Sequence, residues 1–281
     1  MKIGFTFDEK CFNKISTEEL INRAAENNVK SVEISPDVNV LPVREYIKII
    51  KLASDNSFEI NYHIPYFANK LYETNYFSHN KNESIAIYEK FLSLVEGFQQ
   101  FLHNKPVIVI HGAKYISQNQ ASKSLYTTLS FIDWMLNTIE SKNLNLKLGI
   151  ETLRVKEERS IGDTRSDILY IVDNFKTAKL GVCWDICHDA FNYQPDKPPI
   201  DMNFLNNIVY SHIHGTDLSK KISHISLVKS SIDYSSQINS LVEAQYKGVI
   251  NIELLVNYCK ETYIDDLFKD IEYMNKLTKT V

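Results

Sequence analysis

The amino-acid sequence predicts an α/β protein folded as a single (β/α)8 barrel over residues 1–281. Three observations lead to this prediction. Short apolar, β-branched runs alternate with amphipathic stretches, which is the pattern of a parallel sheet built from βα units. Eight such runs are present, and the length of 281 residues suits a barrel of eight units. A doubly wound sheet is the alternative, but the turn after the first run, residues 5–10, contains no glycine-rich phosphate-binding pattern.

The predicted elements follow one another in a regular order. The strands cover residues 2–7, 31–34, 59–63, 107–111, 147–151, 180–185, 209–214 and 249–254. Apolar residues at helical spacing predict helices over residues 17–28, 43–56, 83–102, 121–142, 165–174, 202–206, 235–246 and 264–277. Ser16 directly precedes the first helix and is expected to cap its free backbone N–H groups.

Charge and hydropathy exclude several classes of protein. The net charge is −4 and the isoelectric point is near 6.1, so no overall positive field favours nucleic acid or a membrane surface. No run of about eighteen apolar residues occurs, and charges come too early at the N-terminus for a secretory signal. The four cysteines form no C-x-x-C pair. We therefore expect a cytoplasmic protein with reduced thiols, no membrane contact and no obligate protein partner.

Imidazoles and carboxylates gather where the predicted strands end, which is the active-site face of such a barrel. They are His63, His111, Glu151, Asp185, His188, His212, His214, His224 and Glu253. Each alone is more typical of a hydrogen-bonded rim residue than of a ligand. Together, their buried carboxylates would repel one another unless cations neutralised them. The mixed ligand set predicts divalent metal ions, with Zn²⁺ first and Mn²⁺, Fe²⁺, Co²⁺ or Mg²⁺ as alternatives.

Some polar residues near these strand ends have two interpretations. His212 and His214 share one face of their strand; His214 is closer to its end and is the better ligand, while His212 would orient other groups or contact substrate. Asp217 would orient an imidazole or cap its loop. Cys183 and Cys187 are expected to be small packing residues.

A group of cations follows the fifth predicted strand. These are Arg154, Lys156, Arg159 and Arg165. They would contact phosphate groups of a substrate, or they would form a solvated charged loop.

At these residues the chain resembles the xylose isomerase-like TIM-barrel superfamily and, within it, the endonuclease IV-type branch (AP endonuclease family 2). The motifs that carry the resemblance are short and occur in the order of that branch. They are His63-Ile-Pro-Tyr66 with Asn69, Val109-Ile-His111-Gly112, Ile150-Glu151-Thr152 with Ile161-Gly162, Asp185-Ile-Cys-His188, His214-Gly-Thr-Asp217, His224-Ile-Ser-Leu227 with Ile232-Asp233, and Glu253.

The resemblance implies three metal positions. His63, His111 and Glu151 would hold one ion, with Glu151 bridging to a second ion held by Asp185, His214 and Glu253. His188 and His224 would hold a third ion. The branch has an Asp two positions before the histidine that matches His224, and here that position is Ile222. Tyr66, Asn69, His212 and Asp217 are the expected substrate-binding residues.

The first functional hypothesis is an endonuclease IV-like phosphoesterase that hydrolyses abasic-site DNA or a related phosphodiester with two or three metal ions. Glu151 would bridge the ions, and Glu253 or Asp185 would take a proton from the attacking water. This hypothesis is favoured because a one-metal isomerase has no necessary role for His63 and His111.

The second hypothesis is a sugar or sugar phosphate isomerase or epimerase, in which one metal ion stabilises an enediolate. The resemblance implies that Glu151, Asp185, His214 and Glu253 hold this ion, that the two glutamates move the proton, and that His188 holds a substrate hydroxyl. Aromatic residues near the rim would suit a sugar pocket: Phe7, Tyr66, Phe67, Trp184 and Tyr193. A third hypothesis is a binding protein with a decayed site.

Overall fold

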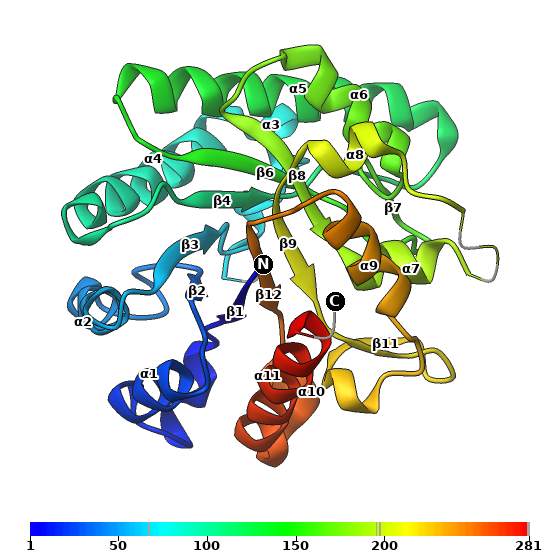
Figure 1. The fold of residues 1–281 in the computed structure, drawn as a ribbon. Coiled ribbons are helices and arrows are strands. Elements are labelled where there is room, and N and C mark those ends of the chain that lie inside the picture. Colours follow the sequence, from blue (N-terminus) through cyan, green and yellow to red (C-terminus); the bar gives the residue numbers. More distant parts are fainter. Residues whose placement is uncertain (67, 195, 197, 280–281) are drawn as a thin grey trace.

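The computed structural model describes residues 1–66, 68–194, 196 and 198–279. Within these residues, eight parallel strands close into a barrel in the order β1, β2, β3, β4, β6, β8, β9 and β12 (Figure 1). The last strand pairs with the first, for instance Phe5 of β1 with Ile252 of β12. The predicted (β/α)8 barrel is therefore confirmed.

The barrel strands lie close to their predicted positions. They are β1 (Lys2–Thr6), β2 (Ser31–Ile34), β3 (Glu59–His63), β4 (Val107–Ile110), β6 (Lys147–Glu151), β8 (Leu180–Asp185), β9 (Ile208–Ile213) and β12 (Val249–Ile252). Nearly all of their residues are buried. Strands covered on both faces read as continuous apolar runs, which is why the sequence locates them well.

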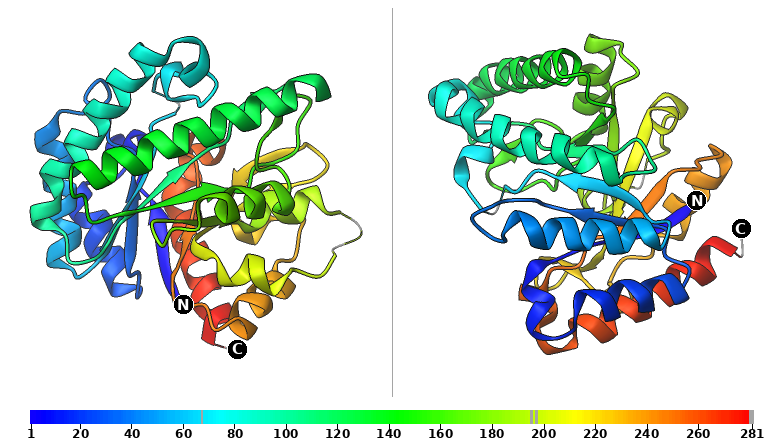
Figure 2. Two further views of the ribbon diagram at one scale, coloured as in Figure 1. Left: turned by 90° about the horizontal axis from the view of Figure 1, so that it is seen from above. Right: turned by 90° about the vertical axis from the view of Figure 1, so that its left-hand side faces the viewer.

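Helices surround the barrel in a ring (Figure 2). The larger set comprises α1 (Thr17–Glu26), α2 (Val43–Asp55), α4 (Lys81–Phe98), α5 (Gln118–Ser141), α6 (Arg165–Phe175), α8 (Met202–Asn206), α9 (Ser235–Glu243) and α11 (Tyr263–Lys279). Ser16 caps α1 as expected, because its side chain accepts a hydrogen bond from Glu19 N at 3.1 Å. Helices α1 and α9 end earlier than predicted because Asn28 and Gln245 have left-handed backbones, with φ of 61° and 56°.

Several small elements were not expected from the sequence. They are α3 (Tyr76–His79), α7 (Ile186–Asn192), α10 (Val256–Cys259), the pair β5 (Lys114–Tyr115) and β7 (Arg159–Ser160), the pair β10 (Gly215–Asp217) and β11 (Ile222–Ile225), and 3-10 helices at Glu9–Asn13, Lys70–Tyr72, Gln99–Phe101, Leu227–Lys229 and Lys260–Thr262. Elements β5, β7, α7, β10, β11 and α10 lie in loops that follow barrel strands. They therefore build up the face at the carboxyl ends of the strands.

The barrel interior has two layers. A small apolar cluster fills part of it: Val107, Val109, Cys183, Tyr210 and Val249. Titratable side chains lie beyond it, toward the carboxyl ends of the strands. Cys183 and Cys187 are buried, free and packed in apolar clusters, as predicted.

The N-terminus and the C-terminal end of α11 lie on the opposite face, near the start of β1 (Figures 1 and 2). In the described part of the chain, no helix has the length and apolar character needed to cross a membrane.

Candidate metal centre

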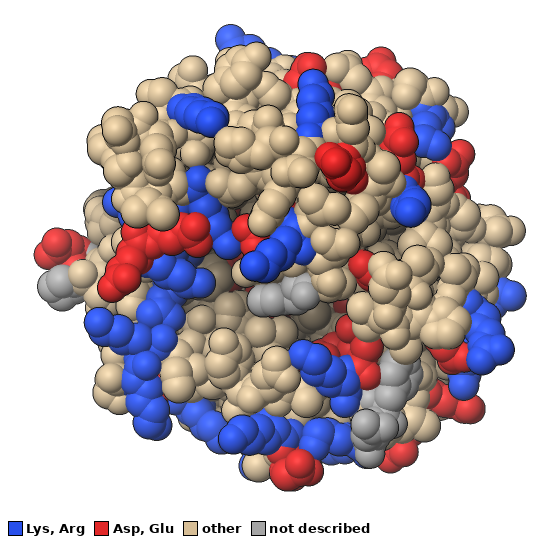
Figure 3. Space-filling view, turned by 180° about the vertical axis from the view of Figure 1, so that it is seen from behind, with Lys and Arg blue, Asp and Glu red and all other residues tan. Residues whose placement is uncertain are grey.

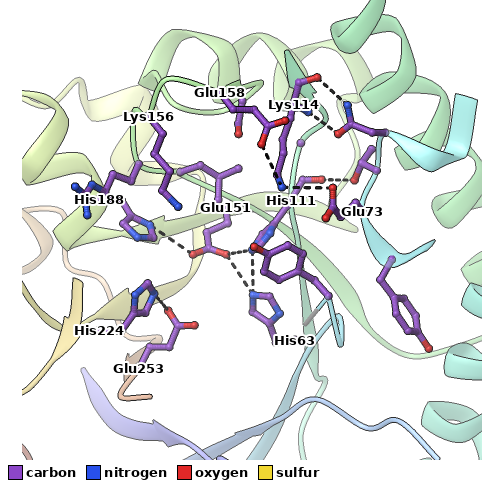
Figure 4. Close-up of a pocket in the computed structure, with 18 residues that line it drawn as sticks. His63, Glu73, His111, Lys114, Glu151, Lys156, Glu158, His188, His224 and Glu253 are labelled. Atoms are coloured by element: carbon purple, nitrogen blue, oxygen red, sulfur yellow. Dashed lines mark hydrogen bonds and ion pairs between the residues drawn. The ribbon is translucent and has the colours of Figure 1, made fainter. Parts of the chain in front are cut away.

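The strand ends bring six of the predicted ligands to the lining of one pocket: His63, His111, Glu151, His188, His224 and Glu253 (Figure 4). His63 ends β3 and Glu151 ends β6, while His111 follows β4 and Glu253 follows β12. Asp185 ends β8, and its helix α7 supplies His188. His214 follows β9, and His224 comes from the hairpin strand β11. Ligand-type side chains from eight positions therefore meet around the barrel axis.

Three sets of these residues are compact enough to hold a metal ion. They are His63 with His111 and Glu151; Glu151 with Asp185, His212 and Glu253; and Asp185 with His188, His214 and His224. In each set the ligand atoms lie within 4.8 Å of one another. Glu151 belongs to the first two sets and Asp185 to the last two, so the sets are joined by shared carboxylates.

The first set is held together by Glu151. Its Oε2 lies 2.7 Å from Nε2 of His111 and 3.4 Å from Nε2 of His63. The two imidazole Nε2 atoms are 3.1 Å apart. His63 donates its Nδ1–H to the carbonyl of Ile64 at 2.7 Å, which fixes the ring so that Nε2 faces the carboxylate. This is the orientation that a metal-binding histidine needs.

The second set contains a fully buried histidine. His212 has 0% exposure, and its Nδ1 lies 3.3 Å from Glu151 and 3.6 Å from Glu253. Its Nε2 lies 2.8 Å from Glu33. The structure thus places His212 with Glu151, Asp185 and Glu253, where the resemblance implied His214. Glu33, a fully buried carboxylate in β2, was missed because one acid in a short apolar run gave no signal of its own.

The third set is organised by Asp185. Its Oδ1 accepts hydrogen bonds from the backbone N–H groups of Cys187 and His188, both at 2.8 Å, and so caps helix α7. Its Oδ2 lies 3.0 Å from His188 Nδ1 and 3.3 Å from His214 Nε2. The carboxylate therefore uses one oxygen to position the helix and presents the other to the histidines.

His224 reaches this set from the β10–β11 hairpin. Its backbone has φ of 62°, which is uncommon for a residue with a side chain. Gly215 lets the hairpin pack closely, because a Cβ there would lie 2.1 Å from the carbonyl oxygen of Ser226. Ring contacts link His224 to His188 and His214, with ring centres 5.3 and 4.1 Å away.

The residues fit divalent metal ions. Four side-chain atoms of these ligands are buried without a hydrogen-bonding partner in the described structure: Asp185 Oδ2, His188 Nδ1, His214 Nε2 and Glu253 Oε2. Leaving a buried polar atom unpaired costs about 1–3 kcal/mol, and more for a charged group. These atoms are carboxylate oxygens and imidazole nitrogens that face one another, so cations between them would satisfy all four.

Electrostatics keeps the carboxylates ionised, as metal ligands must be. Burial by itself would raise the pKa of Glu151, but the imidazoles of His111 and His212 outweigh it and hold that pKa well below its usual range. For Asp185, burial is opposed in the same way, and His188 and His214 lower the pKa. For Glu253, His224 and His212 overcome burial and lower the pKa.

The third set differs from the pattern that the resemblance implied. Ile222 stands at the position of the expected Asp, and neither Asp217 nor Asp233 replaces it. The side chain of Asp217 accepts hydrogen bonds from Ser219 and Lys220 and caps its turn. Asp233 accepts a hydrogen bond from Ser235 N at 3.0 Å. Among the described residues, the third set therefore has one carboxylate and three histidines.

The four predicted substrate-binding residues lie in different places. Tyr66 lines the pocket, with its ring centre 5.2 Å from that of His111. His212 lies beneath the pocket among carboxylates. Asn69 caps a short helix by accepting from Leu71 N at 2.9 Å, and it lines a neighbouring hollow instead. Asp217 caps a turn at the surface, so Asn69 and Asp217 are not brought together with the metal ligands.

The aromatic residues predicted near the rim also lie in different parts of the protein. Tyr66 lines the pocket, and Phe7 lines an adjoining hollow. Trp184 is fully buried against Phe204, and Tyr193 lies under the guanidinium of Arg165. Phe67 lies outside the described residues.

A comparison with models of protein families shows which family this chain belongs to. The model of the family described as "Xylose isomerase-like TIM barrel" matches residues 21–277. The chain belongs to this family. The predicted membership of the xylose isomerase-like superfamily is thereby confirmed.

Two curated proteins match this chain at low identity. The chain is 24% identical over 158 residues to a "Probable endonuclease 4" of Mycoplasma mycoides subsp. mycoides, covering 52% of this chain and 53% of that protein. It is 25% identical over 180 residues to an uncharacterized protein of Methanocaldococcus jannaschii, covering 61% of this chain and 62% of the other. The matches therefore span about half to three fifths of these relatives.

Solved structures of the same fold cover nearly the whole chain. A D-tagatose 3-epimerase-like protein superimposes with a TM-score of 0.68 at 20% identity, covering 98% of this chain and 99% of that one. A D-psicose 3-epimerase of Clostridium cellulolyticum superimposes with a TM-score of 0.72 at 13% identity, covering 99% of each chain. At these identities the likeness shows the xylose isomerase-like fold alone.

Proposed function

We propose that the protein is a divalent-metal-dependent phosphoesterase that hydrolyses a phosphodiester, in DNA or in a smaller molecule, with two or three ions of which zinc is the first choice. One observation supports this above all. His63, His111 and Glu151 form a ligand set in addition to the set around Glu151, Asp185 and Glu253. A single ion in the set of Glu151, Asp185 and Glu253 would not use His63 and His111 as ligands. The partial likeness to a probable endonuclease 4 agrees with this proposal.

Divalent ions bound in these sets would hold phosphate oxygens, activate the attacking water and stabilise the leaving oxygen. Glu151 would join the first two sets through its two oxygens. Glu253 would accept a proton from the attacking water, because its carboxylate is held ionised and its side chain lines the pocket. His63 and His111 close the opposite side of the pocket (Figure 4).

The proposal is tested by metal content and by phosphodiester hydrolysis in the same preparations. We expect two or more zinc ions per chain and metal-dependent cleavage of bis(p-nitrophenyl) phosphate or of an abasic-site duplex. His63→Ala should remove about one ion and most of the activity, whereas His103→Ala should change neither, because His103 lies by a hollow outside this pocket. One ion per chain, unchanged in His63→Ala, would overturn the proposal.

A second candidate is a one-metal sugar isomerase or epimerase. The observation in its favour is that Glu151, Asp185, His212 and Glu253 form a complete four-residue set without His63 and His111. Several solved structures of this fold are those of sugar epimerases. Deuterium exchange from solvent into D-fructose or D-tagatose, followed by NMR, would detect this activity. It would persist in His63→Ala and disappear in Glu151→Gln.

A further inference from the structure

The four cations that follow β6 are of two kinds. Arg159 donates from Nη2 to Asp163 at 2.8 Å, and Arg165 donates from Nη2 to Asp189 at 2.7 Å. Their charges are balanced within the fold. Arg154 and Lys156 both line the pocket of the metal centre, and in the described structure neither has a carboxylate within ion-pair distance. The predicted cationic cluster therefore divides into a structural half and a half that faces the pocket.

Lys156 extends from its loop into the pocket, toward Glu151 and His188 (Figure 4). Burial lowers the pKa of its ammonium group, and the positive charges of Arg154 and Lys114 lower it further. Holding like charges together around one pocket is unfavourable unless an anion offsets them.

Arg154 is fixed in place but not fully satisfied. Its guanidinium lies 4.0 Å from the ring centre of Phe191, and Nη1 donates to the carbonyl of Lys221 at 3.0 Å. Its Nε is buried and has no hydrogen-bonding partner among the described residues. A stacked arginine with a spare N–H group is a preformed donor for an anionic oxygen.

On the opposite side of the same pocket, the positive charge of Lys114 is neutralised by carboxylates. Lys114 Nζ lies 3.4 Å from Glu73 and 3.6 Å from Glu158. Although the net charge is −4, many Lys and Arg side chains lie around the hollow in the face that carries the site, with some Asp and Glu among them (Figure 3). The uncompensated positive charge in the pocket therefore belongs to the side of Arg154 and Lys156.

We propose that Arg154 and Lys156 form a subsite for a phosphate group that the substrate carries in addition to the group held at the metal centre. The substrate class would be a phosphoester with a second phosphate, in a free nucleotide or in a nucleic-acid strand. A phosphate offers charged acceptors to both side chains, and such charge-assisted hydrogen bonds are among the strongest in proteins. The inference rests on the proposed function only in taking this pocket as the active site.

Equilibrium binding to the zinc-loaded protein tests the subsite without requiring turnover. The ligands are thymidine 3′,5′-bisphosphate and thymidine 5′-monophosphate, measured by calorimetry. The wild-type protein should bind the bisphosphate about tenfold more tightly. In Lys156→Gln the two affinities should come within about twofold, and Lys156→Arg should restore the difference. Lys123→Gln, a substitution of an exposed lysine on α5, should behave as wild type.

The outcomes separate the two proposals. Equal affinities in the wild type, or a preference that survives in Lys156→Gln combined with Arg154→Gln, would overturn the subsite. A preference that depends on Lys156, in a protein that hydrolyses no phosphodiester, would support the subsite and leave the proposed function refuted. Loss of single-stranded DNA binding in Lys156→Gln would place the second phosphate in a strand, and unchanged DNA binding with weakened bisphosphate binding would place it in a small molecule.

Discussion

His212 Nε2 lies 2.8 Å from Oε2 of Glu33, and both side chains have 0% exposure. The other ring nitrogen of His212 lies 3.3 Å from Oε1 of Glu151. One imidazole therefore joins a carboxylate of the barrel interior to a carboxylate of the metal centre. Such outer contacts orient metal ligands and maintain their affinity.

Glu33→Gln should weaken zinc binding by about tenfold, because His212 loses the charged partner that orients it toward Glu151. We also expect the free energy of unfolding to fall by about 1–3 kcal/mol. Chelator competition and urea unfolding measure the two effects. The control is Glu59→Gln on the neighbouring strand, where the carboxylate pairs with the partly exposed Lys2; similar losses in both variants would contradict the role of Glu33.

Substitutions of Asp185 should separate metal binding from helix capping. Asp185→Asn keeps an oxygen for the N–H groups of Cys187 and His188 but loses the charge that faces the histidines. Asp185→Ala loses both. Elemental analysis should show lost metal in both variants, while in the metal-free state Asp185→Ala should be less stable than Asp185→Asn by about 1 kcal/mol.

Asp201→Asn is the control for that comparison. Asp201 caps α8 through Asn203 N and does not belong to any of the three ligand sets. It should retain full metal content. Equal stabilities of the two Asp185 variants would show that Oδ1 does not stabilise α7.

Glu9 should make stability depend on pH. Burial raises its pKa from 4.5 to about 7, and Asp8 adds to this, while a hydrogen bond from Tyr46 opposes it. The folded state then binds a proton that the unfolded state has released, so stability falls as the pH rises from about 4.5 to about 7. Relative to wild type, Glu9→Gln should gain about 1–3 kcal/mol between pH 5 and pH 8, measured by urea unfolding. A gain of the same size in Glu18→Gln, at an exposed position of α1, would refute this assignment.

Gly112 lets the loop after β4 lie against Ile161, the residue that follows β7. An added Cβ would lie 2.0 Å from the carbonyl oxygen of Ile161, so Gly112→Ala should lower the free energy of unfolding by about 1–3 kcal/mol. Gly97 lies in α4 with nothing within 4 Å of an added Cβ, and Gly97→Ala should raise stability by about 0.5–1 kcal/mol. Thermal unfolding of the two variants should therefore shift in opposite directions.

The barrel strands could be predicted because each is a short apolar run with a polar residue at its end. That pattern fixes both the strand and the end of the barrel where Glu151 and Asp185 lie. The predicted ligands therefore lie together in space. Helix α7 was not predicted, since it begins directly after Asp185 and its short sequence continues an apolar strand.

The division of ligands among the sets could not be predicted. His212 and His214 lie two residues apart on one strand, and only the depth of each side chain in the barrel decides which carboxylates it meets. In the same way, Arg165 and Lys156 are both cations in the segment after β6, and the sequence does not show which of them is paired. Arg165 is paired because Asp189, distant in the sequence, is presented by α7.

The hydrogen bond from Arg154 to the carbonyl of Lys221 has a consequence for how the pocket responds to ligands. Lys221 lies in the turn between β10 and β11, and this hairpin carries His224. An anion that orders Arg154 would also order the segment that completes the third ligand set. By thermodynamic linkage, a metal ion in that set would then change the affinity for the anion by the same factor as the anion changes the affinity for the metal.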